Sequence, residues 1–390
     1  MSKRILYLSF YFEPDLCAGS FRNSPLVKEL ANQAKEKNAS IEVFTTLPNR
    51  YSTFQSEAPE FEERDNYRIH RIAIPKHKSG MRDQINSFKT YFNAVKKHTR
   101  GQKYDLVVAS SSRLFTAYLG YSIAKKNNTP LYLDIRDIFT DTMEDVLKSS
   151  VAKPGILAVL KFIERKVFNY ATHINLISEG FTPYFKKFRS PGYSFYSNGI
   201  DEEFLNIPSA TRPQNSIKKI VYAGNIGEGQ GLHKIVPQAA KKLGDAYRFL
   251  IVGDGGAKAK LLSEMERLKT NNIQILPPQN RSDLLDLYQD SDFMFIHLND
   301  YDAFKKVLPS KIFELGAYNK PIVAGVAGYA HEFIEKNIPN KILFPPGDSE
   351  SMVRQLSSYA YTQEERVNFK EKFRRTAINK EMSKSILTYL

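Results

Sequence analysis

The stretch Lys305–Gly325 reads KKVLPSKIFELGAYNKPIVAG and decides the fold. Pro309 predicts a helix start, because a proline at the first helical position loses no hydrogen bond and its φ is already set. Asn319-Lys320-Pro321 predicts the end of that helix, and the Ile-Val-Ala-Gly run that follows is typical of a short buried strand. The stretch therefore predicts one helix–strand unit of an α/β domain.

Glu314 lies one turn inside this helix among apolar residues, where a carboxylate needs a partner. The free N–H groups of Ser310, Lys311 and Ile312 would give the helix a positive end suited to a phosphate. A phosphate binder with a carboxylate one turn deeper matches the diphosphate and ribose of a nucleotide. An ordinary amphipathic helix with a tolerated Glu314 is the alternative, and the pattern alone leaves both open.

The composition is that of a globular protein with two domains. A chain of 390 residues, 42% apolar and 25% charged, suggests two domains of nearly equal size.

The single Cys17 excludes an intramolecular disulfide and fits a reducing compartment. The start of the chain does not resemble a signal peptide, and no run has the length of a membrane-spanning helix, so we expect a cytoplasmic, soluble or peripheral protein. The net charge of +14 predicts an acidic partner, for which nucleic acid, anionic lipid and diphosphates all qualify.

The N-terminal half alternates strands with helices, which predicts a parallel sheet covered on both faces. Ligands bind beyond the carboxyl ends of such strands, where Ser111 and the pair Arg136-Asp137 fall. The pair is a candidate for acceptor contact or charge stabilisation, with an exposed ion pair as the alternative. We expect a polar loop over 47–66 and strands over 3–9, 41–46, 68–73, 104–109, 130–135 and 172–177.

A loop after the first strand leads into a helix for which Ser20 is a plausible N-cap. Gly19 either makes a tight turn or leaves room for the phosphate or sugar of a ligand. Arg22, in the first helical turn, is either a solvated charge or points into the cleft that would hold this ligand. The loop lacks G-x-G-x-x-G, so a dinucleotide site is weakly supported.

The Pro- and Ser-rich segment 206–218 has the composition of a linker, so we expect domains over 1–205 and 219–390. The last helix is a candidate for packing back on the first domain. In the second domain a strand over 219–223 leads into Gly224–Gly231, which carries four glycines in eight residues. A second turn, Gly253-Asp254-Gly255-Gly256, follows the next strand. Such glycine loops indicate backbone that approaches a ligand closely.

Segment 76–103 has eight Lys and Arg residues against one acid, Asp83, with apolar residues at helical spacing. It is either a core-facing helix with a solvated basic face or a surface that docks on anionic lipid headgroups. Tyr184–Arg189 is a second basic, aromatic patch of this kind.

In chain order, the motifs resemble the retaining glycosyltransferase family 4. They are YFEPD with Gly19 and Arg22, LDIRD at 133–137, ISEGF at 177–181, SNGID at 197–201, YAGNIGEGQGL at 222–232, VGDG at 252–255 and LPSKIFE at 308–314. The resemblance implies an α/β GT-B fold, in which two Rossmann-like domains face a central cleft. The last motifs look most like the subgroup of bacterial N-acetyl-L-fucosamine transferases of O-antigen and capsule assembly.

The resemblance implies a nucleotide-sugar donor on the second domain and an acceptor on the first. Glu314 would bind the ribose, the helix start at Ser310 the distal phosphate, and Gly19 and the glycine loops the diphosphate. The donor-binding candidates are Gly19, Gly224, Asn225, Gly227, Gln230, Gly253, Asp254, Arg281, Ser310, Lys311, Ile312 and Glu314. The acceptor-binding candidates are Ser20, Arg22 and Ser111, and the catalytic candidates are Glu314, Lys311, Lys306, Arg136 and Asp137.

The chain departs from the family pattern at its charged positions. Lys306 stands where the family commonly has the first Glu of its E-x7-E pair, and Arg136 where it often has His. Asn225 and Gln230 replace the Arg and Lys of the glycine loop. Cationic help for the leaving diphosphate must come from elsewhere, with Lys305, Lys306 and Lys311 as candidates and Arg281 more remote.

We therefore expect a retaining, metal-independent transferase without a cofactor. It would move a sugar, an N-acetylated hexose or deoxyhexose, from UDP to a lipid-linked or soluble saccharide, in peripheral contact with an anionic membrane. The D-x-D of Asp300 and Asp302 lies in a loop and is read as coincidence. A non-hydrolysing UDP-sugar epimerase of the same fold is one alternative, and a basic nucleic-acid-binding protein, suggested only by the net charge, is the other. No nucleic-acid-binding motif is found, so no nucleic-acid partner is expected.

Overall fold

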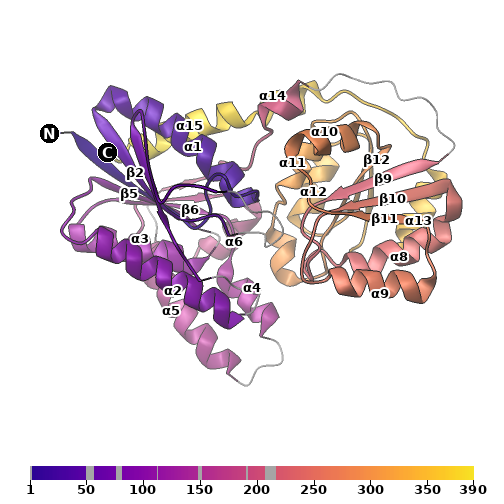
Figure 1. The fold of residues 1–390 in the computed structure, drawn as a ribbon, viewed down its shortest axis with the longest axis horizontal. Helices are drawn as coiled ribbons and strands as arrows, with labels where there is room; N and C mark the ends of the chain where they lie inside the picture. Colours follow the sequence, from indigo (N-terminus) through magenta and orange to yellow (C-terminus); the bar gives the residue numbers. More distant parts are fainter. Residues whose placement is uncertain are drawn as a thin grey trace. The chain divides into compact units, whose positions relative to one another are not determined.

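The computed structural model describes residues 2–49, 57–75, 81–111, 113–147, 152–189, 192–206 and 217–390. The chain forms two compact units, the first of Met1–Asn198 with Thr376–Leu390 and the second of Gly199–Arg375. Each unit is built on its own sheet (Figure 1). Most of the expected linker, residues 207–216, lies outside the described residues.

The first unit has an eight-stranded sheet in the order β3-β4-β2-β1-β5-β6-β7-β8. Every pair is parallel except β3 with β4. The central strands are buried on both faces, which explains their near-continuous apolar sequence. The strands are β1 (Lys3–Ser9), β2 (Ala39–Thr46), β3 (Phe61–Arg64), β4 (Tyr67–Ile72), β5 (Leu106–Ser111), β6 (Leu131–Ile135), β7 (His173–Leu176) and β8 (Tyr193–Ser194).

Helices cover both faces of this sheet. In Figure 1, α1 and α15 lie over one face and α2, α3 and α5 over the other. Met382, Ile386 and Leu387 of α15 join the core between α1 and the sheet. The helices are α1 (Ala18–Ala34), α2 (Met81–His98), α3 (Leu114–Asn127), α4 (Phe139–Val146), α5 (Lys153–Tyr170), α6 (Thr182–Phe185) and α15 (Arg375–Leu387).

Helix α1 begins before Ser20. Cys17 occupies the N-cap position in an extended conformation, and its carbonyl accepts the N–H of Phe21 at 3.0 Å. The N-cap prediction for Ser20 is therefore wrong, because the first turn is already formed when the chain reaches it.

The two basic, aromatic segments turn their rings inward. Phe88 and Tyr91 of α2 are buried, so the core-facing alternative holds for the described part of 76–103, while 76–80 lie outside the described residues. In the patch Tyr184–Arg189, Phe185 and Phe188 are buried against Phe168. Phe88, Tyr91, Phe185 and Phe188 therefore belong to the core, whereas Phe92 and Tyr184 are half-buried and Ile85 is exposed.

The second unit has a six-stranded, fully parallel sheet in the order β11-β10-β9-β12-β13-β14. Chain order reverses between β9 and β12, which is the arrangement of dinucleotide-binding sheets, and ligands bind at the carboxyl ends of the strands at such a reversal. The strands are β9 (Lys218–Ala223), β10 (Tyr247–Val252), β11 (Ile273–Leu276), β12 (Phe293–His297), β13 (Ile322–Gly325) and β14 (Lys341–Phe344).

Helices also cover both faces of the second sheet. Helices α8, α9 and α13 pack on one face, and α10, α11, α12 and α14 on the other. The bounds are α8 (Leu232–Leu243), α9 (Lys258–Leu268), α10 (Arg281–Gln289), α11 (Lys311–Gly316), α12 (Tyr329–Asn337), α13 (Ser349–Ser358) and α14 (Val367–Lys372).

The second unit begins earlier than the expected boundary after residue 205. The Ile200 N–H donates to the Phe373 carbonyl at 2.7 Å, and the Arg375 N–H donates to the Ile200 carbonyl at 2.9 Å. These bonds tie α7 (Glu202–Leu205) to the second unit, where Phe204 is fully buried. The boundary was placed on composition, and composition does not register this pairing.

Candidate functional site

The candidate site lies at the carboxyl ends of β9 and β12, where the strand order of the second unit reverses. The glycine loop Gly224–Gly231 follows β9, and Asn299 follows β12. The Asn299 N–H donates to the Gly229 carbonyl at 2.8 Å, and its side-chain amide donates to the Glu228 carbonyl at 3.1 Å. The two segments that flank the reversal are therefore held together.

The glycine loop folds over Gly227. The Asn225 side-chain amide donates to Gln230 Oε1 at 2.9 Å, and a Cβ at Gly227 would lie 2.3 Å from Asn225 Nδ2. Gly231 has a φ of +58°, which lets the chain turn into α8. The side-chain amides of Asn225 and Gln230 therefore hydrogen-bond to each other.

The second glycine turn packs on the first. Gly253 has a φ of +144°, and a Cβ there would lie 1.9 Å from the Gly224 carbonyl oxygen. The Ile226 N–H donates to the Asp254 carbonyl at 2.8 Å, and the Asp254 carboxylate accepts the Gly255 N–H at 2.9 Å. Gly253 and Asp254 thus shape the loop that would contact a ligand.

His297, the last residue of β12, is a site residue that the sequence analysis missed. Its Nε2 accepts the Gly347 N–H at 2.9 Å, so Nδ1 carries the proton and donates to the Gln230 carbonyl at 2.6 Å. Burial lowers the pKa of this imidazole to about 4. A histidine at the end of the apolar strand FMFIH was the available signal.

Helix α11 carries Glu314 but begins later than predicted, at Lys311 with Ser310 as N-cap. The Ile312 N–H donates to the Pro309 carbonyl at 3.1 Å, so the prediction that it is free for a phosphate is wrong. Within the described part of the chain, the N–H groups of Ser310 and Lys311 make no backbone hydrogen bond. The helix is only six residues long, which limits the positive potential at its start.

Glu314 is buried, with 7% of its surface exposed, and has a partner on its own helix. Lys311 Nζ donates to Glu314 Oε2 at 2.7 Å and lies 3.5 Å from the Tyr288 hydroxyl. Burial alone would lower the pKa of Lys311, but Glu314 and Tyr288 more than offset this and raise it, so the side chain stays an ammonium. Among the described residues none donates to Glu314 Oε1, which leaves that oxygen able to accept from a ligand.

Two other predicted cations of the second unit, Arg281 and Lys305, pair with acids. Arg281 pairs with Asp201 and Glu203 and lies over the Phe204 ring, 5.1 Å from its centre. Lys305 Nζ lies 2.7 Å from the Asp302 carboxylate. Lys306 ends the short helix η4 (Asp302–Lys306), next to Lys305.

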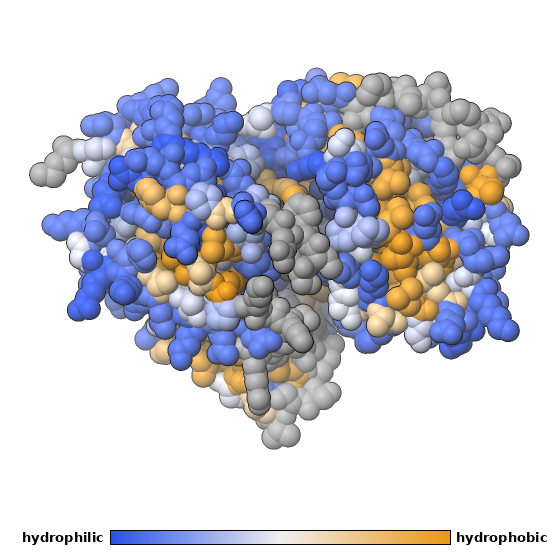
Figure 2. Space-filling view, in the orientation of Figure 1, coloured by the Kyte–Doolittle hydropathy of each residue, from blue (hydrophilic) through white to orange (hydrophobic). Residues whose placement is uncertain are grey.

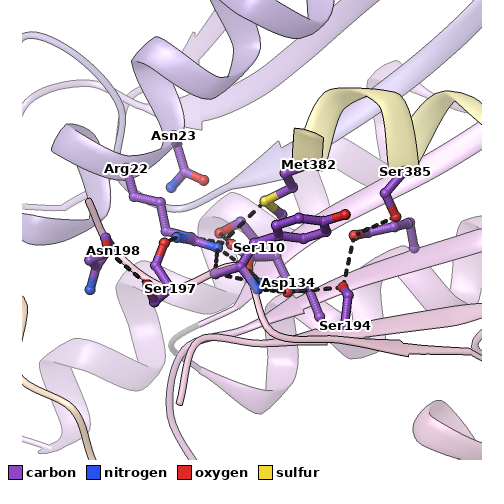
Figure 3. Close-up of polar contacts among 12 residues, drawn as sticks. Arg22, Asn23, Ser110, Asp134, Ser194, Ser197, Asn198, Met382 and Ser385 are labelled. Carbon is purple, nitrogen blue, oxygen red and sulfur yellow. Dashed lines mark hydrogen bonds and ion pairs between the residues drawn. The ribbon is translucent and has the colours of Figure 1, made fainter. Parts of the chain in front are cut away.

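Arg22 belongs to a buried network in the first unit (Figure 3). Its Nε and Nη2 each donate to the Asp134 carboxylate at 2.8 Å, and Nη1 donates to the Ser197 carbonyl at 2.9 Å. Ser110 and Asn175 also donate to Asp134. Because Arg22 is only 2% exposed, this geometry favours a structural role over the predicted acceptor contact.

Gly19 and Arg136 lie together at the carboxyl edge of the first sheet. A Cβ at Gly19 would lie 3.0 Å from Arg136 Nη1, so the missing side chain makes room for this guanidinium. Burial lowers the pKa of Arg136. Ser20 and Ser111 are buried, and the Ser111 hydroxyl donates to the Arg113 carbonyl.

Asp137 follows Arg136 beyond the end of β6. Its carboxylate accepts the Thr142 hydroxyl at 3.4 Å, and burial raises its pKa to about 6. A carboxyl group that titrates near neutral pH can hold or release a proton at this edge.

The described residues include no helix that is long and apolar enough to span a membrane.

Comparisons with known proteins bear on the fold and on the second unit. Residues 206–376 match the family described as Glycosyl transferases group 1. The chain is 25% identical over 340 residues to the colanic acid biosynthesis glycosyl transferase WcaI of Escherichia coli K12, across 79% of this chain and 80% of that protein. Its structure resembles sucrose-phosphate synthase of Thermosynechococcus elongatus with a TM-score of 0.74 and 13% identity, covering 99% of this chain and 98% of the other. It also resembles HepE of Anabaena, solved in complex with UDP, with a TM-score of 0.64 and 16% identity, covering 99% and 100%.

Proposed function

We propose that the chain is a group 1 glycosyltransferase that moves a sugar from a UDP-sugar to a saccharide acceptor with retention of configuration, which the match over residues 206–376 and the similarity to WcaI support. We propose an N-acetylated hexose or deoxyhexose as the sugar and a lipid-linked saccharide as the acceptor. The similarity to WcaI supports a role in bacterial surface polysaccharide assembly, O-antigen or capsule, at the inner face of the cell membrane.

The observation that carries the proposal is the geometry of Glu314. One carboxylate oxygen is held by Lys311, and the other accepts nothing from the described residues, which suits it to the ribose hydroxyls of a nucleotide. The diphosphate would run along the glycine loop toward the N–H groups of Ser310 and Lys311. The HepE structure with UDP supports UDP as the nucleotide.

In the proposed reaction, the bond between the anomeric carbon and the diphosphate oxygen breaks, and its electron pair stays on the diphosphate. The acceptor oxygen attacks the oxocarbenium-like centre from the face that the diphosphate leaves, and the acceptor proton passes to a departing phosphate oxygen. The positive groups Lys311 and Lys306, with the N–H groups of Ser310 and Lys311, would stabilise the charge on the leaving group. These groups can do so without a metal ion.

For the acceptor we propose the carboxyl edge of the first sheet. Arg136 and Asp137 lie there, and Asp137 can exchange a proton near neutral pH because burial raises its pKa to about 6. Ser20 and Ser111 are buried at the same edge and would act through its shape rather than by direct contact.

The test is the thermal stabilisation of the full chain by UDP, GDP, ADP and CMP, with and without EDTA. A ligand that binds only the folded protein raises the melting temperature once its concentration passes Kd. We expect stabilisation by UDP, unchanged by EDTA and reduced in Glu314→Gln. Glu332→Gln, which changes an exposed glutamate on α12, is the matched control. No stabilisation by any of the nucleotides would contradict the proposed donor site.

A further inference from the structure

Helix α5 has apolar residues on two faces. Its inner face packs Leu157, Leu160, Val167 and Phe168 into the first unit. Its outer face exposes Ile156 by 37% and Val159 and Phe162 by 58% each, at a spacing of three residues. Figure 2 shows hydrophobic surface among hydrophilic atoms at the lower end of the first unit, where Figure 1 places α5. We call these three residues with Lys161, Arg165 and Lys166 the α5 surface.

The charge of the α5 surface has one sign. Lys161, Arg165 and Lys166 are exposed, and the only acid of α5, Glu164, is buried, where it accepts the hydroxyls of Thr140 and Tyr184. The neighbouring helix α3 has no acidic residue and carries two lysines in its last turn. From α4, Glu144 lies 3.8 Å from Lys153 at the other end of the helix. An anionic partner therefore meets cations over the second half of α5.

A hollow of about 530 Å³ lies beside Phe162 and is lined by Tyr121, Phe162, Arg165, Lys166, Asn169 and Tyr170. Lys166 Nζ lies 4.3 Å from the centre of the Phe162 ring. Asn169 Oδ1 already accepts the Arg189 N–H at 2.8 Å, so its NH2 group remains a donor. A guanidinium, an ammonium and an amide at one hollow suit the phosphodiester of a lipid headgroup.

We propose that the α5 surface docks the enzyme on an anionic lipid bilayer. Ile156, Val159 and Phe162 would enter the boundary between headgroups and acyl chains, while Arg165 and Lys166 bind headgroup phosphates. A helix whose outer face combines apolar residues with cations and lacks carboxylates fits a bilayer better than a protein surface of mixed charge. The inference rests on the proposed lipid-linked acceptor, which such docking would bring within reach.

The test is co-sedimentation of the full chain with vesicles of phosphatidylcholine, alone or mixed with phosphatidylglycerol. We expect binding to the mixed vesicles only, weakened by salt. Arg165→Gln with Lys166→Gln should weaken binding on the order of thirtyfold, from about 1 kcal/mol per basic residue near an anionic surface. Val159→Ser with Phe162→Ser should weaken it at least as much.

Two controls change similar residues elsewhere. Leu262→Ser removes an apolar side chain that is 48% exposed on α9, and Lys96→Gln with Lys97→Gln removes two exposed charges of α2. Both should bind the mixed vesicles as the unchanged protein does. Equal binding by the α5 variants, or loss in the α2 variant alone, would overturn the proposal. A dimer that forms without lipid and is broken by the Val159 and Phe162 changes would also overturn it, in favour of a protein partner.

The same variants are melted with UDP, which reports on the donor site separately. We expect every one of them to keep the full UDP stabilisation. Loss of vesicle binding in the α5 variants supports the α5 surface even when UDP stabilises none of the proteins, whereas absent UDP stabilisation alone counts against the donor site.

Discussion

Replacing Asp134 by Asn should destabilise the first unit strongly. The carboxylate is fully buried and accepts four hydrogen bonds, two from Arg22 and one each from Ser110 and Asn175. An asparagine keeps the shape but loses the charge and one accepting oxygen. The Arg22 guanidinium would then be a buried cation without an anionic partner.

The size of the effect follows from this burial. Removing one partner of a buried ion pair costs about 3–5 kcal/mol. In a unit of this size, each kcal/mol lowers the melting temperature by about 2–4 °C, so a fall on the order of 10 °C is expected. The Arg22 guanidinium holds the pKa of Asp134 below its usual value although burial opposes this. The stabilisation by Asp134 is therefore present near neutral pH and is lost as pH falls through that lowered pKa.

Scanning calorimetry of the full chain is the assay, with UDP added so that the second unit can be followed separately. Asp65→Asn is the control, because Asp65 pairs with Lys35 on the surface with 78% of its side chain exposed, and such pairs contribute about 1 kcal/mol or less. A change of about 1 kcal/mol or less in Asp134→Asn would refute the structural role of the Arg22 network. Arg22 would then return as a candidate for acceptor contact.

Three further predictions concern single residues. Gly253→Ala should destabilise the second unit by at least about 2 kcal/mol and abolish UDP stabilisation, because the new Cβ would lie 1.9 Å from the Gly224 carbonyl oxygen. Gly256→Ala is the control and should do neither, because a Cβ at Gly256 has no atom within 4 Å. His297 should make the second unit lose stability as pH falls from 6.5 to about 4, because the imidazole binds a proton at higher pH in the unfolded chain than in the folded protein. In His297→Asn, the free energy of unfolding measured by urea melts should depend less on pH over this range. Asp137→Asn should raise the melting temperature at pH 7 relative to the unchanged protein. The pKa of Asp137 is about 6 in the folded state and 3.8 ordinarily, so ionisation of this carboxyl group costs stability as pH rises. An unchanged melting temperature would mean that Asp137 is solvated.

The architecture was predictable because the sequences of buried parallel strands are short apolar runs that lie between amphipathic helices. The run at 219–223 corresponds to β9, and the strand expected before the Gly253 turn corresponds to β10. Strand β3 was missed, since Phe61–Arg64 is a half-exposed edge with only one large apolar residue and falls where a polar loop was expected. The strand order, and with it the reversal at β9 and β12, depends on pairing that no local pattern records.

The partners of polar groups were less predictable than the elements. Asp134 lies 112 residues from Arg22 in the sequence, so the residues around Arg22 do not indicate that it forms a buried ion pair. The Ile312 N–H is used because the first turn of α11 closes on Pro309, a detail of backbone geometry. The outer face of α5 escaped notice because an apolar side chain looks the same in sequence whether it faces the core or the solvent.

The central claim, a UDP-sugar site at Glu314, is tested most directly by calorimetric titration of UDP into the unchanged protein, Glu314→Gln and the control Glu332→Gln. Losing charge-assisted hydrogen bonds to the ribose, at about 1.5–3 kcal/mol each, should weaken UDP binding at least tenfold in Glu314→Gln. Glu332→Gln should leave the Kd unchanged. Equal Kd values for Glu314→Gln and the unchanged protein would contradict the assignment of the ribose to this carboxylate.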